Sequence, residues 1–466
     1  MQKHVELNIN LYKEMCSILL TNKTDKGLLQ KANAYIKLRG PDHTSVYEAE
    51  GLTFIHNLLS ITGDFLKQPF IDEEAGLACI YNGEIYNTLE FDKNYKSDGE
   101  CIIPLYKKYG KDFVKKLDGE YAIILVDFQN KNIILASDTF LTKPLWYGKN
   151  GKDFSIGSYK SSVELTGIKA TRMKPNTCKI FDFDFNLLDE YAVYDFCLNQ
   201  HKNTYDDWTK AFEKSIKKRA ADNVRENIFI GMSSGYDSGA IACELNKQNI
   251  NFTAYSVSGS ENKKIIRDRF NIISKNAETH YLEGCMAEYV KAKQHIQKNV
   301  EPYTFEIFSS RSDYKEHIPL TGDGGANGLS LVCSKAIKEN KKIYMSGTGA
   351  DEIFSDYGWN GNSVAPHSNF GGLFPDDLES IFPWASFYGS SQISYLTKEE
   401  LVGGSYGIEN RYPFLDRDVV QEFLWLKPEL KNRFYKNVLH NYMLENKFPH
   451  TERKSGFWYK DRNSEG

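Results

Sequence analysis

The chain has 466 residues, which is too long for one hydrophobic core, so two domains are expected. Hydrophobic residues make up 41% of it and aromatic residues 14%, a composition that excludes a disordered or fibrous chain. The net charge is −4 and no long basic run occurs, so nucleic acid is not an expected partner.

Cysteine usage and hydropathy bear on the cellular compartment. The eight cysteines are irregularly spaced and include no CxxC pair, which indicates reduced thiols and neither a disulfide framework nor a zinc site. No apolar run approaches the roughly 20 residues of a membrane span, and residues 1–15 lack the apolar core of a signal peptide. The sequence therefore predicts a cytoplasmic protein that does not associate with membranes.

Short apolar segments follow one another over residues 1–195, each bounded by Gly, Asn, Asp or Lys clusters. This pattern is typical of packed antiparallel strands. The segments are 16–20, 52–59, 76–86, 121–128, 132–138 and 178–185.

The pattern changes after a polar linker at residues 197–208. Buried strands are predicted at 227–232, 252–258 and 342–346, and helical stretches such as 238–246 lie between them. Strands that alternate with helices indicate a parallel, doubly wound sheet covered on both faces. The expected organisation is an extension at 1–15, a first domain at 16–196 and a second at 205–466.

The segment MSSGYDS at residues 232–238 directly follows a predicted strand and opens a helix. Small residues let backbone N–H groups converge on an anion at a helix N-terminus, where the helix dipole also favours negative charge. A carboxylate cannot itself contact phosphate, so Asp237 is predicted to bind a bridging Mg²⁺. The alternative is an ordinary turn in which Ser and Asp cap the helix.

A second segment, SGTGADE at residues 346–352, also follows a strand and ends in acidic residues. Ligands bind at the carboxyl edge of a parallel sheet, where both loops would lie. Asp237 and Asp351 are therefore expected to converge on one metal–pyrophosphate group.

These loops resemble the S-G-G-x-D-S and S-G-x-G-x-D-E loops of the asparagine synthetase family. Residues 407–416 (GIENRYPFLD), Lys436 and residues 453–457 (RKSGF) also match segments of that family. The resemblance implies an ATP pyrophosphatase domain that uses ATP and Mg²⁺, activates a carboxylate as its adenylate and releases AMP and pyrophosphate. It assigns ATP and pyrophosphate binding to Ser233, Ser234, Gly235, Asp237, Ser238, Val257, Ser346 and Gly347.

The resemblance also assigns catalytic roles. Lys454 would stabilise the adenylate and the tetrahedral intermediate, as a fixed charge beside developing oxyanions can. Glu409 would be catalytic, although an ion pair with Arg411 is an equal alternative. Thr348 and Glu352 would line the acceptor pocket, with walls from residues 321–329 and 359–374. For Gly322–Gly325 the sequence favours a flexible loop over a pyrophosphate-binding one.

The first domain resembles the N-terminal-nucleophile glutaminase domain of the same family, which has an αββα fold. The motifs that match in order are RGPD at 39–42, QP at 68–69, NGEIYN at 82–87, SDGE at 97–100, LDGE at 117–120 and KPL at 143–145. The resemblance implies that Asn82 and Gly83 form the oxyanion hole and that Glu84 and Asp98 hold the amino group of glutamine. Glutamine or ammonia and a small-molecule or peptide carboxylate are the expected partners, and a homodimer is left open.

The nucleophile of this family is an N-terminal cysteine, because a free α-amine can take the thiol proton. Cys16 stands at the matching position but follows 15 other residues. Three alternatives are open: translation starts at Met15, residues 1–15 are a removable propeptide, or the extension remains and Cys16 has no free amine.

Two departures from the family pattern leave the reaction open. Leu58 stands where the family has an Arg for the glutamine carboxylate, and a leucine cannot make that contact. Thr348 stands where asparagine synthetases have Glu and β-lactam-forming relatives have Tyr. The expected function is ATP-dependent amidation of a carboxylate other than aspartate. The alternatives are a ligase that uses a substrate amine and has an inactive glutaminase domain, and a true asparagine synthetase. A non-catalytic binding protein is a third, weaker alternative.

Overall fold

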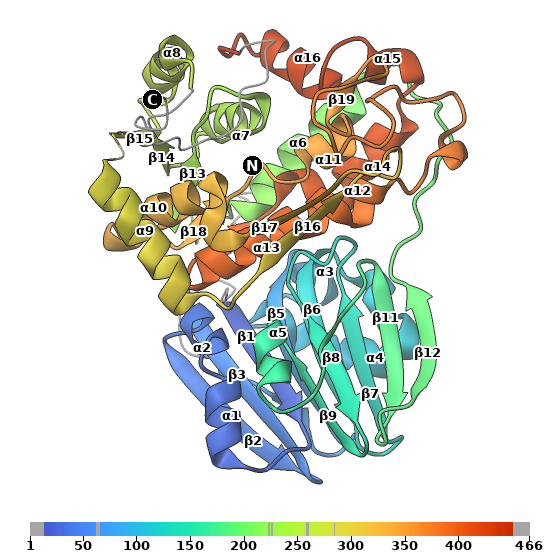
Figure 1. Ribbon diagram of the computed structural model, residues 1–466. Coiled ribbons are helices and arrows are strands. Elements are labelled where there is room, and N and C mark those ends of the chain that lie inside the picture. The colour runs from blue at the N-terminus through green and yellow to red at the C-terminus, as the bar shows by residue number, and fades with distance from the viewer. Residues whose placement is uncertain are drawn as a thin grey trace, which may run out of the picture. The chain divides into compact units, whose positions relative to one another are not determined.

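The computed structural model describes residues 14–61, 66–221, 224, 227–257, 261–283 and 285–450. The chain divides into two compact units, one that ends at Tyr194 and one that begins at Asp195 (Figure 1). None of the helices in the described ranges has the length and apolar character needed to cross a membrane.

Two antiparallel six-stranded sheets form the first unit. One sheet has the order β10 (Thr171–Arg172), β8 (Trp146–Asn150), β9 (Asp153–Gly157), β1 (Glu14–Thr21), β3 (Leu52–Ser60) and β2 (His43–Ala49). The other has the order β12 (Leu187–Ala192), β11 (Thr177–Asp182), β7 (Asn132–Ser137), β6 (Gly119–Asp127), β5 (Leu77–Ile85) and β4 (Phe70–Asp72).

The two sheets are the inner layers of a four-layer sandwich. All nine residues of β5 and eight of the nine in β3 are buried, so these strands are covered on both faces. β1 packs against β5 of the other sheet, while helices cover the outer faces. The helices are α1 (Lys26–Ala32), α2 (Ile36–Arg39), α3 (Thr88–Phe91), η1 (Asp98–Cys101), α4 (Ile102–Tyr109), η2 (Gly110–Lys116) and α5 (Lys160–Glu164). The expected αββα class is confirmed.

The second unit contains a five-stranded parallel sheet. Its order is β15 (Ala277–Leu282), β14 (Phe252–Val257), β13 (Ile228–Gly231), β18 (Ile343–Met345) and β21 (Glu409–Arg411). The chain runs outward from β13 through β14 to β15 and then returns to add β18 on the opposite side of β13. The topological switch point, where ligands bind in such sheets, therefore lies between β13 and β18.

Helices and short elements surround this sheet (Figure 1). The helices are α6 (Asp206–Arg219), α7 (Tyr236–Lys247), α8 (Lys263–Ile273), α9 (Met286–Asn299), α10 (Gly324–Lys338), α11 (Ala350–Phe354), α12 (Ala385–Tyr388), α13 (Ser390–Gly404), α14 (Arg417–Trp425), α15 (Pro428–Asn432) and α16 (Asn437–Glu445). The short elements are η4 (Leu320–Gly322), η5 (Leu378–Ser380), η6 (Pro413–Leu415) and the hairpins β16 (Thr304–Phe308) with β17 (Lys315–Pro319) and β19 (Gly358–Trp359) with β20 (Asn362–Ser363).

The glycine-rich stretch before α10 differs from the sequence expectation. It was expected as a flexible loop, but Gly324 and Gly325 form the first turn of α10. Asp323 caps this helix, because its carboxylate accepts a hydrogen bond from the Ala326 amide at 2.6 Å. The cap supplies the local order that the composition alone did not indicate.

Candidate active site

The loop between β13 and α7 is held from outside by two buried side chains. Arg269 donates to the Ser233 and Ser234 carbonyls at 2.5 and 3.2 Å. Glu261 Oε2 accepts hydrogen bonds from the amide and the hydroxyl of Ser234, each at 2.5 Å. Asp237 follows this loop in the first turn of α7 and lines a cavity.

The loop between β18 and α11 packs directly against the first loop. A Cβ atom on Gly347 would lie 2.8 Å from Cβ of Asp237, so only glycine permits this approach. Gly349 has φ +101°, and a Cβ there would meet Leu415 at 2.5 Å. The turn brings Asp351 into the first turn of α11.

The two aspartates converge on one ammonium group. Lys436 Nζ lies 2.5 Å from Asp237 Oδ1 and 2.9 Å from Asp351 Oδ1. Burial alone would lower the pKa of Lys436, but the two carboxylates outweigh burial and hold it above its usual value. Lys436 also has φ +49°, an uncommon backbone conformation for a lysine. The Tyr435 hydroxyl donates to Asp351 Oδ1 as well.

The loops open into a cavity of about 430 Å³. Residues anticipated from the sequence that line it are Ser233, Gly235, Asp237, Ser238, Gly347, Thr348, Asp351 and Glu352. Both stretches expected to form pocket walls contribute, through Asp323, Gly324, Gly325, Leu329, Ala365 and His367.

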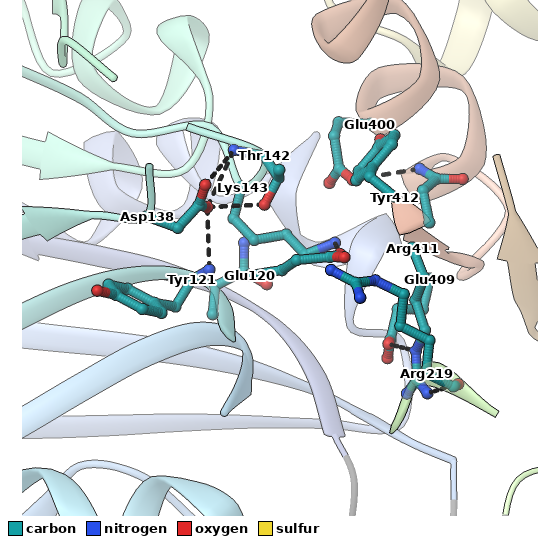
Figure 2. Close-up of polar contacts among 12 residues, drawn as sticks. Glu120, Tyr121, Asp138, Thr142, Lys143, Arg219, Glu400, Glu409, Arg411 and Tyr412 are labelled. Carbon is teal, nitrogen blue, oxygen red and sulfur yellow. Dashed lines mark hydrogen bonds and ion pairs between the residues drawn. The ribbon is translucent and has the colours of Figure 1, made fainter. Parts of the chain in front are cut away.

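Four anticipated residues lie outside this lining. Ser234 is engaged with Glu261, Val257 is buried at the end of β14, and the Ser346 hydroxyl accepts from the Thr348 amide at 3.0 Å. Glu409 is fully buried on β21 and forms an ion pair with Arg411, which is the alternative left open by the sequence (Figure 2). Arg411 in turn donates to the Arg219 carbonyl. The catalytic role of Glu409 stays a prediction, and Lys454 lies outside the described residues.

Thr348 and Glu352, which the sequence predicts to bind the acceptor, lie together in the cavity lining. The Thr348 hydroxyl donates to Glu399 Oε1 at 2.9 Å. Glu352 accepts hydrogen bonds from the Tyr357 hydroxyl at 2.5 Å and the Gly349 amide at 3.1 Å. Burial, and after it the charge of Asp351, raises the pKa of Glu352 to about 7.

In the first unit, Cys16 and Asn82 face each other from the two sheets. The Cys16 amide donates to Asn82 Oδ1 at 3.3 Å, while Asn82 Nδ2 is buried without a hydrogen-bond partner among the described residues. An unused buried N–H donor on a side chain that contacts the Cys16 backbone agrees with the oxyanion hole predicted from the sequence. Gly83 has φ +138°, and a Cβ there would lie 1.9 Å from the Glu120 carbonyl oxygen. The backbone at Gly83 therefore requires glycine.

The acidic residues anticipated for glutamine binding lie near this thiol. Burial, and after it the charges of Asp98, Glu84 and Cys16, holds the pKa of Tyr81 well above its usual value. Asp98 accepts hydrogen bonds from the Tyr81 hydroxyl at 2.5 Å and from the Ile85 amide at 2.6 Å. The geometry thus gathers Cys16, Asn82, Glu84 and Asp98.

One departure from the family's glutaminase pattern lies beside Cys16, which belongs to β1. Leu58, which is fully buried, lies directly opposite Cys16 in the β1–β3 ladder. Arg39, also fully buried, donates through Nε to the Cys16 carbonyl at 3.0 Å.

The turn after β7 is fixed by the Asp138 carboxylate, which accepts from the Tyr121 amide and from the Thr142 amide and hydroxyl (Figure 2). This turn positions Lys143, whose ammonium lies 3.7 Å from the carboxylate of Glu120. Both members of that ion pair are buried, and Glu120 pairs with Glu84 in the β5–β6 ladder. The KPL and LDGE motifs of the sequence therefore meet in one charge pair beside the anticipated glutamine-binding residues.

Sequence reasoning missed much of the cavity wall. The residues not anticipated as site residues include Tyr344, Tyr357, Tyr395, Lys398, Glu399 and Tyr435. Lys398 and Glu399 lie in the middle of α13, where no motif marks them. Lys436 could be recognised from the sequence, because it stands at a lysine position of the family. No sequence pattern indicated that it lies between the two aspartates.

Comparisons with known proteins agree with both units. The glutamine amidotransferase domain family matches residues 15–205, and the asparagine synthase family matches residues 207–386. A putative glutamine-hydrolysing asparagine synthetase of Methanocaldococcus jannaschii is 26% identical over 82% of this chain and 72% of its own length. Asparagine synthetase 2 of Oryza sativa subsp. japonica is 25% identical over 97% of this chain and 77% of its own.

Among solved structures, one is described as the allosteric regulatory enzyme of purine biosynthesis. Its match covers 57% of this chain and 80% of the other chain, with 15% sequence identity and a TM-score of 0.34. That likeness is too weak to inform function. The sequence matches and the two folds together show a glutamine amidotransferase domain followed by an asparagine synthase domain. The chain is accordingly a distant homologue of the glutamine-hydrolysing asparagine synthetases and an ATP-dependent amidotransferase of that family.

Proposed function

We propose that the chain activates a carboxylate other than aspartate as its adenylate, releases pyrophosphate, and forms an amide with ammonia supplied by glutamine. The observation that carries the proposal is the convergence of Asp237 and Asp351 on Lys436 Nζ, at 2.5 and 2.9 Å. The two aspartates follow neighbouring strands at the switch point of the sheet, where nucleotides bind in doubly wound folds.

Asp237 and Asp351 suit a magnesium ion. Their oxygens already flank one cation, the Lys436 ammonium, and carboxylates are the protein ligands that Mg²⁺ prefers. A bound Mg²⁺ would neutralise charge on the pyrophosphate leaving group. The Lys436 ammonium would then bind phosphate oxygens, and the positive end of the α7 dipole would favour the same anion.

The acceptor carboxylate would lie at the Thr348 end of the cavity. Thr348 offers neither a carboxylate nor a phenol, and its hydroxyl is already used by Glu399 at 2.9 Å. Because the position differs in charge and size from that of an asparagine synthetase, an acceptor other than aspartate is favoured.

A change of either aspartate tests this activation chemistry. Asp237→Asn or Asp351→Asn should abolish substrate-dependent pyrophosphate release, because each removes half of the anionic pair that holds the metal. The assay is pyrophosphate release across a panel of carboxylic acids, with circular dichroism to verify folding. Release at the wild-type rate in either folded variant would defeat the proposal.

A second candidate function is a ligase that uses an amine of its substrate and retains the first unit as a structural remnant. Leu58 opposite Cys16 favours it, because a leucine cannot bind the carboxylate of glutamine. The mass of the mature protein separates the two candidates. A chain that begins at Cys16 supports ammonia transfer, whereas a chain that retains residues before Cys16 supports the remnant function.

A further inference from the structure

Two side chains of the edge strand β15 meet the C-terminal end of α10. One oxygen of Glu278, one ring nitrogen of His280 and one oxygen of Glu339 all lie within 4.8 Å of one another. Glu278 and His280 share a face of the strand because they are two residues apart, and Glu339 is the C-cap residue of α10. In the described ranges no other trio of His, Cys, Asp or Glu side chains comes this close. The three side chains therefore form a compact group of possible metal ligands.

The imidazole of His280 is held in place, but one of its nitrogens is unused. The ring stacks on Tyr255 of the neighbouring strand β14, with ring centroids 5.1 Å apart and an angle of 18° between the planes. His280 Nε2 is buried, makes no hydrogen bond to any described residue, and lies 3.6 Å from Glu339 Oε2. That separation is too long for a hydrogen bond, but it is close to the distance of about 3.4 Å between two ligand atoms of a tetrahedral Zn²⁺ ion. An ion bound between the two atoms would use both.

Glu339 is oriented by contacts that leave it able to bind an ion. The Tyr255 hydroxyl donates to Glu339 Oε2, and Lys335 Nζ lies 2.8 Å from Glu339 Oε1. A carboxylate oxygen has two lone pairs, so Oε2 can bind a metal while it accepts from Tyr255. Hydrogen bonds of this kind orient the ligands of metal centres. Glu278 is exposed, so its carboxylate can move toward the ion and water can complete the coordination.

We propose that Glu278, His280 and Glu339 form a binding site for a divalent transition-metal ion, of which Zn²⁺ fits best. An imidazole nitrogen favours Zn²⁺ and its neighbours over Mg²⁺ and Ca²⁺, which prefer oxygen ligands. Three protein ligands and a water molecule are a coordination that Zn²⁺ adopts. None of these three residues lines the cavity, so the site is separate from that of the Mg²⁺ ion in the proposed function. The bound ion would join β15 to the end of α10, whose first turn lines the cavity.

His317 offers a matched control. It is an exposed strand residue, and its direct partner across the β16–β17 ladder is Glu306. A histidine with one acidic neighbour provides too few ligands to bind Zn²⁺ tightly. His317→Gln therefore makes the same chemical change as His280→Gln on a strand outside the three-residue group.

The test is calorimetric titration of the metal-free full chain with Zn²⁺ in excess Mg²⁺, after alkylation of the exposed thiols of Cys197 and Cys285. The wild type and His317→Gln should bind Zn²⁺ equally, whereas His280→Gln and Glu278→Gln should bind it at least about tenfold more weakly. Even an outer contact of a metal ligand is worth about tenfold in affinity, so the loss of a ligand should cost no less. Because Glu278 is exposed, its variant tests the site even where His280→Gln fails to fold. Zn²⁺ should also raise the Tm of the wild type, since an ion that binds the folded chain stabilises it.

Three results would overturn the proposal. They are the absence of Zn²⁺ binding by the wild type, an unchanged affinity in folded His280→Gln or Glu278→Gln, and an equal loss of affinity in His317→Gln. None of these measurements uses pyrophosphate release, so failure of the metal site and failure of the proposed function are distinguishable.

Discussion

Within the described ranges, buried polar atoms without hydrogen-bond partners occur in different settings. Asn82 contacts the Cys16 amide through its other amide atom, and Glu399 lines the cavity, where a ligand can reach it. His56 differs, since it is fully buried on β3 and neither ring nitrogen has a partner among the described residues. Burial, and after it the charge of His43, lowers the pKa of His56 to about 3. An unpaired buried group therefore indicates a site only where a ligand can reach it.

Because the buried His56 side chain is neutral, the folded protein should lose stability in acid. The unfolded chain protonates this imidazole below pH 6.5, whereas the folded chain does not until about pH 3, so stability is lost as the pH falls through that window. The His56 contribution should fall by about 1.4 kcal/mol for each pH unit below 6.5. Urea unfolding of the wild type and His56→Gln between pH 7 and pH 5 checks this, and equal pH slopes in the two proteins would contradict it.

The two strand–turn–helix loops of the second unit pack closely against each other. Each loop alone is a common turn, and the proposed function requires both. Gly347 fixes that distance, because its missing Cβ leaves room for Cβ of Asp237. The single ammonium of Lys436 bridges the aspartates across this contact.

Gly347→Ala should separate the loops while leaving the sheet intact. An added Cβ would lie 2.8 Å from Asp237, so the carboxylates must move apart by a few tenths of an ångström or more. A displacement that approaches 1 Å can lower activity by about 100-fold, so we expect a fall of about tenfold to 100-fold in pyrophosphate release. Gly322→Ala is the control, because an added Cβ there meets nothing within 4 Å. Equal activities of the two variants would show that the Gly347 contact does not position the aspartates.

The chain contains two units, and the proposed function assigns a separate reaction to each. Cys16, Asn82, Glu84 and Asp98 belong to the first, and the cavity between the β13 and β18 loops belongs to the second. If the first unit only supplies nitrogen, its loss should not affect the activation of the acceptor. An external supply of ammonia should then replace it.

Cys16→Ala should remove glutamine-dependent amide formation and spare the ammonia-dependent reaction. The thiol is the nucleophile toward glutamine in the proposed function, whereas ammonia enters the reaction without it. The measurement is product formation with glutamine or with ammonium chloride as nitrogen source. Asp237→Asn serves as the contrasting variant, since it should lose both activities. A Cys16→Ala protein that loses both would contradict separate sites for nitrogen supply and activation.

Local sequence was sufficient for several features. Alternating apolar segments predicted the strands of the first unit, and strand–helix alternation predicted the parallel sheet of the second, because side-chain periodicity reports burial directly. The loops at 232–238 and 346–352 were found from small residues and a carboxylate placed after a strand. Asn82, Glu84 and Asp98 were found only through the resemblance, because short turn motifs have little meaning without a family context.

Other features depend on packing between segments far apart in the chain. Lys436 reaches the aspartates of two distant loops, and Glu399 joins Thr348 from the middle of α13, although neither placement has a local pattern. The alternation rule also could not show that β3 and β5 are buried on both faces, since that depends on which layers cover them. Sequence periodicity shows which residues that are close along the chain share a face of a helix or strand. The meeting of side chains separated by hundreds of residues is set by the folded core.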